Sequence, residues 1–234
     1  MRVGIIGAMD EEIQLLKDRI KNCQEQVIAN FEFSIGQLEN QNIVLLKSGI
    51  GKVNAAIATT LLDQHFKCDY IINTGTAAGL HKNIKIGAVV IASELRYYDV
   101  DVTSFGYEYG QVPKMPPFYK SDPFLLELAA QSANQITKHQ ILTGLIVSGD
   151  SFLNESVQIS LIQEKFPNVL AAEMEACAIA QVCYKFNIPF VIVRSISDLA
   201  DHKSHLDFMH VAAQNLTKFI LVILQKLTRM QHQC

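Results

Sequence analysis

The chain has 234 residues, of which 49% are hydrophobic and only 18% are charged. This balance excludes an intrinsically disordered protein and is typical of one large α/β domain, which we expect to span residues 1–234. A formal charge of −3 without a basic stretch argues against binding nucleic acid through its phosphates. We therefore expect small molecules or further copies of this chain as partners.

The cysteines and the amino-terminal sequence indicate a reducing compartment. Five cysteines are scattered along the chain and never spaced as C-x-x-C, so neither a disulfide framework nor a zinc knuckle is expected. The chain begins MRVGIIGAMDEE, without a basic region followed by a long apolar one, and contains no uncharged apolar run of membrane-spanning length. The sequence predicts a cytoplasmic protein that does not contact membranes.

In the first half of the chain, short apolar runs that are typical of strands alternate with segments whose apolar residues have helical spacing. Alternation of apolar and polar residues on both sides of Glu39 to Gln41 predicts a hairpin there. The elements expected here are a strand at 3–8, a helix at 13–20, hairpin strands at 31–38 and 43–47, a helix at 53–65, and strands at 70–73 and 88–92.

The second half continues this alternation after a long segment rich in aromatic residues and proline, residues 97–119. Loops of this length are usually lids or interfaces, although its aromatic side chains could also cover an edge of the core. The elements expected here are helices at 123–136 and 157–165, strands at 141–147, 169–172 and 191–196, and a long amphipathic helix at 206–227. Together the elements predict a mixed β-sheet wrapped by helices in three layers, α/β/α.

Polar or glycine-bearing segments follow four of the expected strands, at residues 9–12, 74–79, 148–153 and 195–198. Ligands in such sheets bind beyond the carboxyl ends of the strands, so these segments form a candidate site. Asp10 and Glu11 can equally be helix caps favoured by the helix dipole. For Glu12, both a capping role and a catalytic role remain open.

Several other motifs are incomplete. The segment SGIGKVN resembles a phosphate-binding loop, but Leu46 and Val53 stand where a glycine and a magnesium-binding hydroxyl are required. None of the histidines lies in a strand-end turn with a nucleophile elbow, so we do not expect acyl transfer by a Ser-His-Asp triad. A group of acids and histidines has metal-capable spacing but lacks H-E-x-x-H, so we expect neither a metal nor a cofactor; its members are Asp201, His202, His205, Asp207 and His210.

Three carboxylates, Glu173, Glu175 and Asp198, lie within or beside some of the most apolar sequence of the chain. Buried carboxylates require hydrogen bonds or charged partners. Carboxylates at separate strand ends are used to break a bond to an anomeric carbon. The small residues after Glu175 favour a helix start, so one of the two glutamates should be structural and the other should face a ligand. Asp198 can alternatively be a helix N-cap.

Eight long segments, distributed over most of the chain, carry a specific resemblance. They are GIIGAMDEE, LLKSGIGKVNAA, INTGTAAGL, DVDVTSFGYEYGQVP, GLIVSGDSF, AAEMEACAIA, PFVIVRSISDLAD and SHLDF. In these segments the chain resembles the bacterial 5′-methylthioadenosine/S-adenosylhomocysteine nucleosidases. The resemblance implies a nucleoside phosphorylase-like fold, a homodimer, and hydrolysis of the N-glycosidic bond to adenine and a 5-thio-ribose.

The resemblance also assigns roles to individual residues. Glu12 matches the base that activates water, Asp198 the acid that protonates adenine N7, and Glu175 the carboxylate that binds the ribose hydroxyls. Arg194 would hold Glu175, and Ser197 would position Asp198. Further residues would contact the substrate: Met9 and Met174 at the sugar, Phe152 and Leu153 at adenine, Ile50 and Phe208 at the alkylthio tail, and Thr76, Ala77 and Glu173 elsewhere in the site. Val102, Phe105 and Pro113 match residues that enter the partner subunit's site.

The chain departs from the usual pattern of this family at four positions. Thr76 replaces serine, Ala78 replaces glycine, Cys177 stands at a threonine-like position, and Ser195 stands where alanine is common. The added methyl groups at residues 76 and 78 should narrow the pocket near the base.

Two alternative functions remain: a nucleoside phosphorylase, and a nucleoside-binding protein without catalysis. Three acids at residues 10–12 would repel phosphate, although Arg96 could bind it. Binding alone would require neither Glu12 nor Asp198.

Overall fold

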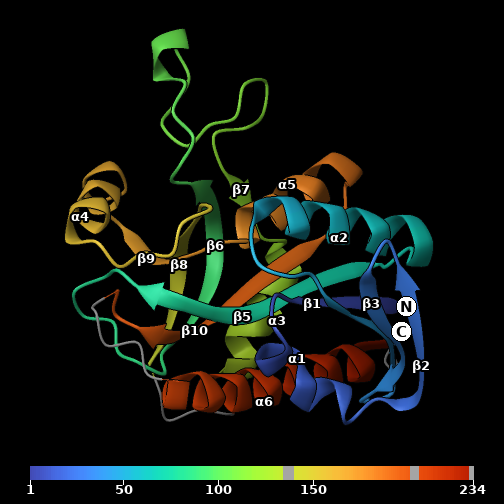
Figure 1. Ribbon diagram of the computed structural model, residues 1–234. Helices are drawn as coiled ribbons and strands as arrows, with labels where there is room; N and C mark the ends of the chain where they lie inside the picture. The colour runs from blue at the N-terminus through green and yellow to red at the C-terminus, as the bar shows by residue number, and fades with distance from the viewer. Residues whose placement is uncertain (134–139, 201–205, 232–234) are drawn as a thin grey trace.

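The structure, a computed structural model, describes residues 1–133, 140–200 and 206–231. It confirms the expected α/β class, with a mixed sheet covered by helices on both faces (Figure 1). The helices are α1 (Asp10–Lys17), α2 (Lys52–Phe66), α3 (Pro123–Ala133), α4 (Ser156–Lys165), α5 (Ala176–Phe186) and α6 (Leu206–Gln231). The strands are β1 (Arg2–Gly7), β2 (Lys21–Ile28), β3 (Phe31–Leu38), β4 (Gln41–Lys47), β5 (Tyr70–Gly79), β6 (Val89–Tyr97), β7 (Tyr119–Lys120), β8 (Ile141–Ser148), β9 (Val169–Glu173) and β10 (Phe190–Asp198).

Part of the sheet closes on itself. Strand β10 pairs in parallel with β5 and antiparallel with β6, and the path β6-β8-β9-β5 returns to the same place, so these five strands form a ring. The remaining long strands extend outward from β5 in the order β1-β4-β3-β2. Strands β1, β5 and β10 are mutually parallel along this path, and their carboxyl ends therefore lie at the same edge.

Two hydrophobic clusters sandwich the sheet. Helices α2 and α5 cover one face, and α1, α3 and α6 cover the other (Figure 1). Small residues of α5 are completely buried, among them Ala176, Cys177 and Ala180, and they let this helix pack closely against Ala55 and Ala58 of α2. No helix in the described part of the chain is both long and apolar enough to span a bilayer.

Two expectations about strands were wrong. Residues 74–79, expected as a turn after a short strand, continue β5 because β10 pairs with them on one side and β9 with their last residues. Strand β2 was not expected at all, since it lies at the edge of the sheet and its side chains are almost all exposed, which leaves no apolar alternation to detect.

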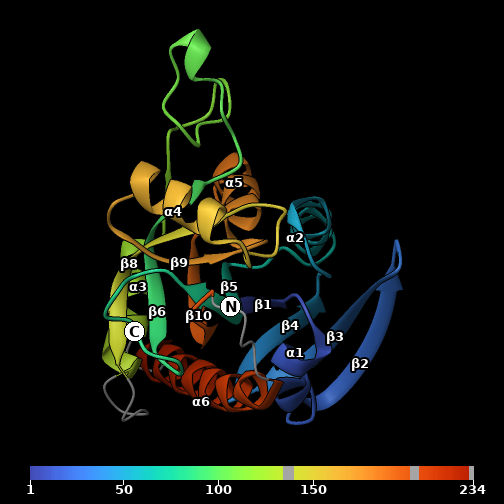
Figure 2. The ribbon, with the colours of Figure 1, turned by 60° about the vertical axis from the view of Figure 1, so that its left-hand side comes forward.

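The segment between β6 and β7 protrudes from the body of the molecule in both views (Figures 1 and 2). Apart from one 3₁₀ turn, Thr103–Phe105, it contains no helix or strand, as expected. The side chain of Phe105 is 80% exposed.

Candidate active site

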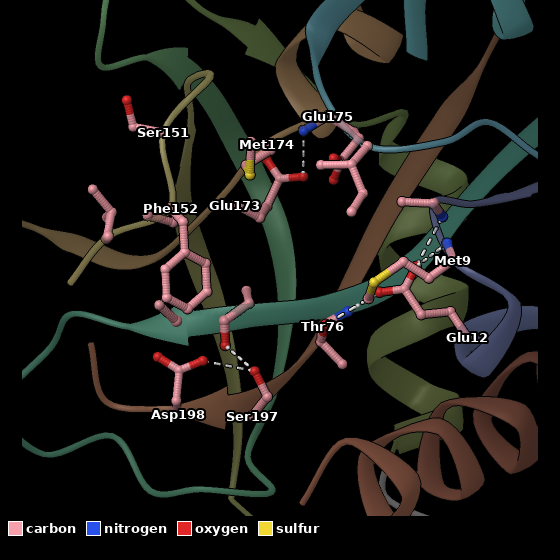
Figure 3. A pocket seen from close by; sticks show the side chains of 16 residues that line it. Met9, Glu12, Thr76, Ser151, Phe152, Glu173, Met174, Glu175, Ser197 and Asp198 are labelled. Carbon is pink, nitrogen blue, oxygen red and sulfur yellow. Dashed lines mark hydrogen bonds between the residues drawn. The ribbon is translucent and has the colours of Figure 1, made fainter. Parts of the chain in front are cut away.

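A cavity of about 330 Å³ opens at the carboxyl ends of β1, β5 and β10 (Figure 3). All four segments predicted from the sequence reach it, and residues 172–175 and Ile50 complete its wall. The predicted site residues that line it are Met9, Glu12, Ile50, Thr76, Ala77, Phe152, Leu153, Glu173, Met174, Glu175, Ser197 and Asp198. The structure therefore brings these twelve residues together around one cavity.

Glu12 lies in the first turn of α1 and is 4% exposed. Its Oε2 accepts hydrogen bonds from the backbone N–H groups of Ala8 and Met9, at 2.8 and 3.2 Å. Its Oε1 accepts from the backbone N–H and the hydroxyl of Thr76, at 2.8 and 3.1 Å. Glu12 thus caps its own helix and also reaches across to β5, so both roles left open for it are compatible.

Asp198 ends β10 at another side of the cavity and is 8% exposed. The hydroxyl of Ser197 donates to its Oδ2 and the backbone N–H of Ala200 donates to its Oδ1, both at 2.9 Å. Because Ala200 has a left-handed φ of 54°, the chain turns here instead of entering a helix. The N-cap alternative for Asp198 is therefore wrong, and each of its oxygens has only one donor among the described residues.

Glu173 and Arg194 form a buried ion pair behind the cavity wall. Nη2 of Arg194 donates to Oε2 of Glu173 at 2.6 Å. The same oxygen accepts the backbone N–H groups of Glu175 and Ala176, and Oε1 accepts the Ser148 hydroxyl. Glu173 is therefore saturated by protein donors and is the structural member of the glutamate pair, although its side chain borders the cavity.

Arg194 was expected to hold Glu175, but its hydrogen bond goes to Glu173 and only a longer contact of 3.9 Å reaches Oε2 of Glu175. The difference has a geometric reason, since the chain bends between β9 and α5. Burial alone would lower the pKa of Arg194, but Glu173, Glu12 and Glu175 together raise it. Arg194 consequently remains a cation.

Glu175 faces the cavity with fewer partners. Its Oε1 accepts the backbone N–H of Gly51 at 2.8 Å. Burial, reinforced by the negative charge of Glu173, raises the pKa of Glu175 to about 8, against the opposing effects of Arg194 and of the Gly51 N–H. A carboxyl group in this position can accept hydrogen bonds from two neighbouring hydroxyls when it is ionised.

Glycine is required at residue 75, where two charged side chains approach the backbone. A Cβ atom there would lie 2.7 Å from Nη1 of Arg194 and 2.7 Å from Oε1 of Glu12. Both distances are far below van der Waals contact, so any side chain would displace one of the two. Gly75 thereby lets the guanidinium and the carboxylate lie close to the same strand.

The rest of the cavity is largely apolar. Met9 and Met174 border it from two sides, while Phe152, which is 64% exposed, lies at its mouth beside the buried Leu153 (Figure 3). A flat apolar surface opposite carboxylates suits a ligand with an aromatic base and a polar sugar. Residues that line the cavity without having been predicted as ligands are Ala8, Ala78, Ser151 and Ala172; all of them adjoin predicted ones.

Some predicted site residues lie elsewhere. The side chain of Phe208 falls outside the part of the chain that the structure describes, as do the side chains of the acid and histidine group at 201–210. Val102, Phe105 and Pro113 belong to the protruding segment and do not line this cavity. Within the described residues, no cluster of three potential metal ligands occurs.

Comparisons with known proteins agree with this geometry. A family model described as the phosphorylase superfamily matches residues 2–225. The chain is 50% identical to a 5′-methylthioadenosine/S-adenosylhomocysteine nucleosidase of Geobacillus over 232 residues, which is 98% of this chain and 100% of the relative.

Solved structures show the same similarity. The nucleosidase of Neisseria meningitidis in complex with methylthio-immucillin-A superimposes with a TM-score of 0.93 at 44% identity, covering 96% of this chain and 99% of that one. The nucleosidase of Colwellia psychrerythraea in complex with adenine gives a TM-score of 0.95 at 39% identity, covering 97% and 96%. The chain therefore belongs to the phosphorylase superfamily and, within it, to the 5′-methylthioadenosine/S-adenosylhomocysteine nucleosidases.

Proposed function

We propose that this chain hydrolyses the N-glycosidic bond of 5′-methylthioadenosine and S-adenosylhomocysteine, and also of 5′-deoxyadenosine, with residues 1–234 acting as one catalytic domain. The observation that carries the proposal is the presence of two carboxylates, Glu12 and Asp198, on separate walls of one cavity, with Glu175 also facing it. Family membership and the complexes of relatives with adenine and methylthio-immucillin-A support the same chemistry.

Asp198 acts on the leaving group. As the bond between C1′ and N9 breaks, its electron pair moves into the purine, and a proton from Asp198 to N7 lets adenine leave as a neutral molecule. The Ser197 hydroxyl and the Ala200 N–H fix the orientation of the carboxyl group. Phe152 and Leu153 bind the base that receives the proton.

Glu12 acts on the nucleophile. It removes a proton from a water molecule that attacks C1′, where positive charge develops in the transition state. The hydroxyl of Thr76 is 3.1 Å from Oε1 of Glu12, and a hydroxyl proton can rotate. When it turns away, Oε1 keeps the hydrogen bond from the Thr76 N–H and has a second lone pair with which to accept the proton of water. Thr76 thus retains the function of the more common serine.

Glu175 accepts hydrogen bonds from the ribose hydroxyls, and Met9 and Met174 contact the sugar. Ile50, which is 51% exposed at the cavity wall, encloses the 5′-substituent together with Phe208. Glu173 and Arg194 contribute by holding the segment that carries Met174 and Glu175. The methyl groups of Thr76 and Ala78 narrow the pocket near the base.

Water is favoured over phosphate as the nucleophile. Among the described residues that line the cavity, four are acids and none is Lys or Arg. Arg194 lies behind the wall, neutralised by Glu173. Arg96 is engaged by Glu94 and Glu108, at 2.6 and 2.9 Å, and it is not among the lining residues. An anionic nucleophile would be repelled by this arrangement.

The active form is a homodimer in which Val102, Phe105 and Pro113 of one subunit approach the cavity of the other. Their exposure or partial exposure on the protruding segment supports this arrangement. A second, mostly apolar cavity of about 400 Å³ between α2, α5 and the base of that segment adds surface for a second copy. A cytoplasmic location suits the free cysteines of the described chain.

The nucleophile can be tested with purified enzyme in phosphate-free buffer. We expect release of adenine from 5′-methylthioadenosine and S-adenosylhomocysteine without added phosphate, because water is the acceptor. Adenine and the reducing sugar are quantified by chromatography, with inosine as the control substrate. Release that occurs only after phosphate is added would identify a phosphorylase instead, and a preference for inosine would exclude the assignment.

The two catalytic carboxylates can be tested by isosteric amides. Glu12→Gln and Asp198→Asn should each lower kcat by about 10²–10⁴-fold, the usual contribution of a general acid or base, while a nucleoside inhibitor still binds. Asp10→Asn is the matched control, since Asp10 lies in the same turn as Glu12 but pairs with Lys47 on the surface. Near-full activity of either amide variant would contradict its assigned role.

The raised pKa of Glu175 predicts a pH dependence of binding. Only the ionised carboxylate accepts both ribose hydrogen bonds, so affinity for a non-hydrolysable 5′-thionucleoside should increase as pH rises toward about 8, by about tenfold per unit. The native state holds this proton more tightly than the unfolded state, so the free energy of unfolding should fall over the same range. Glu175→Gln should abolish both trends; a flat binding profile in the unsubstituted enzyme would contradict the prediction.

The contribution of the partner subunit can be tested by complementation. Glu12→Gln lacks the base and Phe105→Asp introduces a charge into the partner's site, so each variant alone should be weakly active. In a mixed dimer one site combines an intact Glu12 with an intact Phe105. After subunit exchange the mixture should recover about a quarter of the unsubstituted activity if subunits pair at random. No recovery, with mixed dimers verified by mass, would exclude a shared site.

A further inference from the structure

Three charged residues outside the cavity lining, Lys52, Asp99 and Asp150, form a closed ring of hydrogen bonds. The backbone N–H of Lys52 donates to Oδ1 of Asp150 at 2.8 Å. The backbone N–H of Asp150 donates to Oδ2 of Asp99 at 2.9 Å. The ammonium group of Lys52 closes the ring by donating to the same Asp99 oxygen at 2.6 Å. Side-chain exposures of 23% to 46% leave the ring partly shielded from solvent.

The ring joins two walls of the cavity. Asp150 stands two residues before Phe152, on the side assigned to adenine. Lys52 follows Ile50, assigned to the 5′-substituent, and Gly51, which contacts the ribose-binding Glu175. Asp99 follows β6 at the base of the protruding segment. These three segments meet at the ring, so a displacement of one would be transmitted to the others.

Gly51 connects the ring to Glu175. The φ of Gly51 is 97°, a conformation that residues with a side chain rarely adopt, and a Cβ there would lie 3.2 Å from Oδ1 of Asp150. Lys52 begins α2, and its N–H is one of the groups that have no partner within the helix. Asp150, which belongs to another segment, accepts this N–H. The hydrogen bond therefore fixes the Gly51–Lys52 peptide and, with it, the orientation of Gly51. The Gly51 N–H is thereby aimed at Oε1 of Glu175.

We infer that Asp150 is a positioning residue for the cleavage proposed above: through Lys52 and Gly51 it orients the ribose-binding carboxylate of Glu175, and with Asp99 it ties the turn that carries Phe152 to the start of α2. The inference rests on the proposed function. It assigns a role to a residue that does not contact the substrate. It also couples the base of the protruding segment, where Asp99 lies, to the active site.

The test compares Asp150→Ala with Asp150→Asn. Alanine removes the acceptor of the Lys52 N–H, whereas the asparagine oxygen retains it. Hydrogen bonds to ribose exist in both ground and transition states, so Asp150→Ala should raise KM for 5′-methylthioadenosine about tenfold and change kcat by less than about threefold. Asp150→Asn should recover most of the affinity. Lys52→Met, which keeps the backbone N–H but removes the ammonium group, should raise KM by about threefold.

A second readout distinguishes positioning from a general loss of structure. Glu175 is faced by Glu173 of β9, Arg194 of β10 and Glu12 of α1, and the Gly51 N–H lowers its pKa. In Asp150→Ala this N–H is misaligned, so the pH at which nucleoside affinity rises should move upward. Asp122→Ala is the matched control, because Asp122 accepts the N–H of Leu125 at 3.0 Å at the start of α3, away from the cavity, and it should leave KM and the pH profile unchanged.

The outcomes separate this inference from the function on which it rests. An unsubstituted enzyme that releases no adenine would overturn the function. If it releases adenine, three results would each overturn the inference: an unchanged KM and pH profile in Asp150→Ala, equal defects in the alanine and asparagine variants, or equal effects of Asp122→Ala. Should Asp150→Ala not fold, the Lys52→Met variant decides, because an unchanged KM there would also contradict the ring.

Discussion

The buried ion pair between Glu173 and Arg194 is the interaction on which the site depends. Arg194 is 1% exposed and Glu173 8%, and an unpaired charge at such depth would destabilise the fold by several kcal/mol. The pair is satisfied by a network, since Glu173 also accepts from Ser148 and from the backbone at the start of α5. One carboxylate thus joins β8, β9, β10 and α5, and it fixes the direction in which the chain presents Glu175.

This pairing also determines the charge of the cavity. Because Arg194 donates its hydrogen bond to Glu173, Glu175 has only the longer contact of 3.9 Å with this cation, and burial raises the pKa of Glu175 in spite of it. Among the described lining residues this leaves three carboxyl groups, those of Glu12, Glu175 and Asp198, without a hydrogen bond to a cationic side chain. A site of this kind can bind hydroxyl donors and stabilise positive charge that develops at an anomeric carbon, but it disfavours an anionic nucleophile.

Much of the fold could be predicted from the sequence because apolar runs and helical spacing report directly on burial. The strand at residues 3–8 and the long carboxyl-terminal helix are examples, shifted by a residue or a few. Strand β2 has no such pattern, since it is an edge strand whose side chains are nearly all exposed and whose position is set by backbone pairing with β3. Residues 74–79 look like a turn by composition, and only pairing with distant β10 and β9 makes them a strand.

Part of the site, like part of the fold, could be predicted from the sequence. Glu173, Glu175 and Asp198 could be singled out because acids within or beside apolar sequence need partners, and Glu12 through the family resemblance, whereas the partner of Arg194 could not be predicted. Glu173 and Glu175 are two residues apart, so spacing alone gives them one side of a strand or roughly opposite sides of a helix. The chain does neither: β9 ends at Glu173 and α5 begins at Ala176, and Glu175 at the junction has φ −132° and ψ −39°. That single bend sends Glu173 to the arginine and Glu175 to the cavity, and it separates an acid saturated by protein donors from one that has room for a ligand.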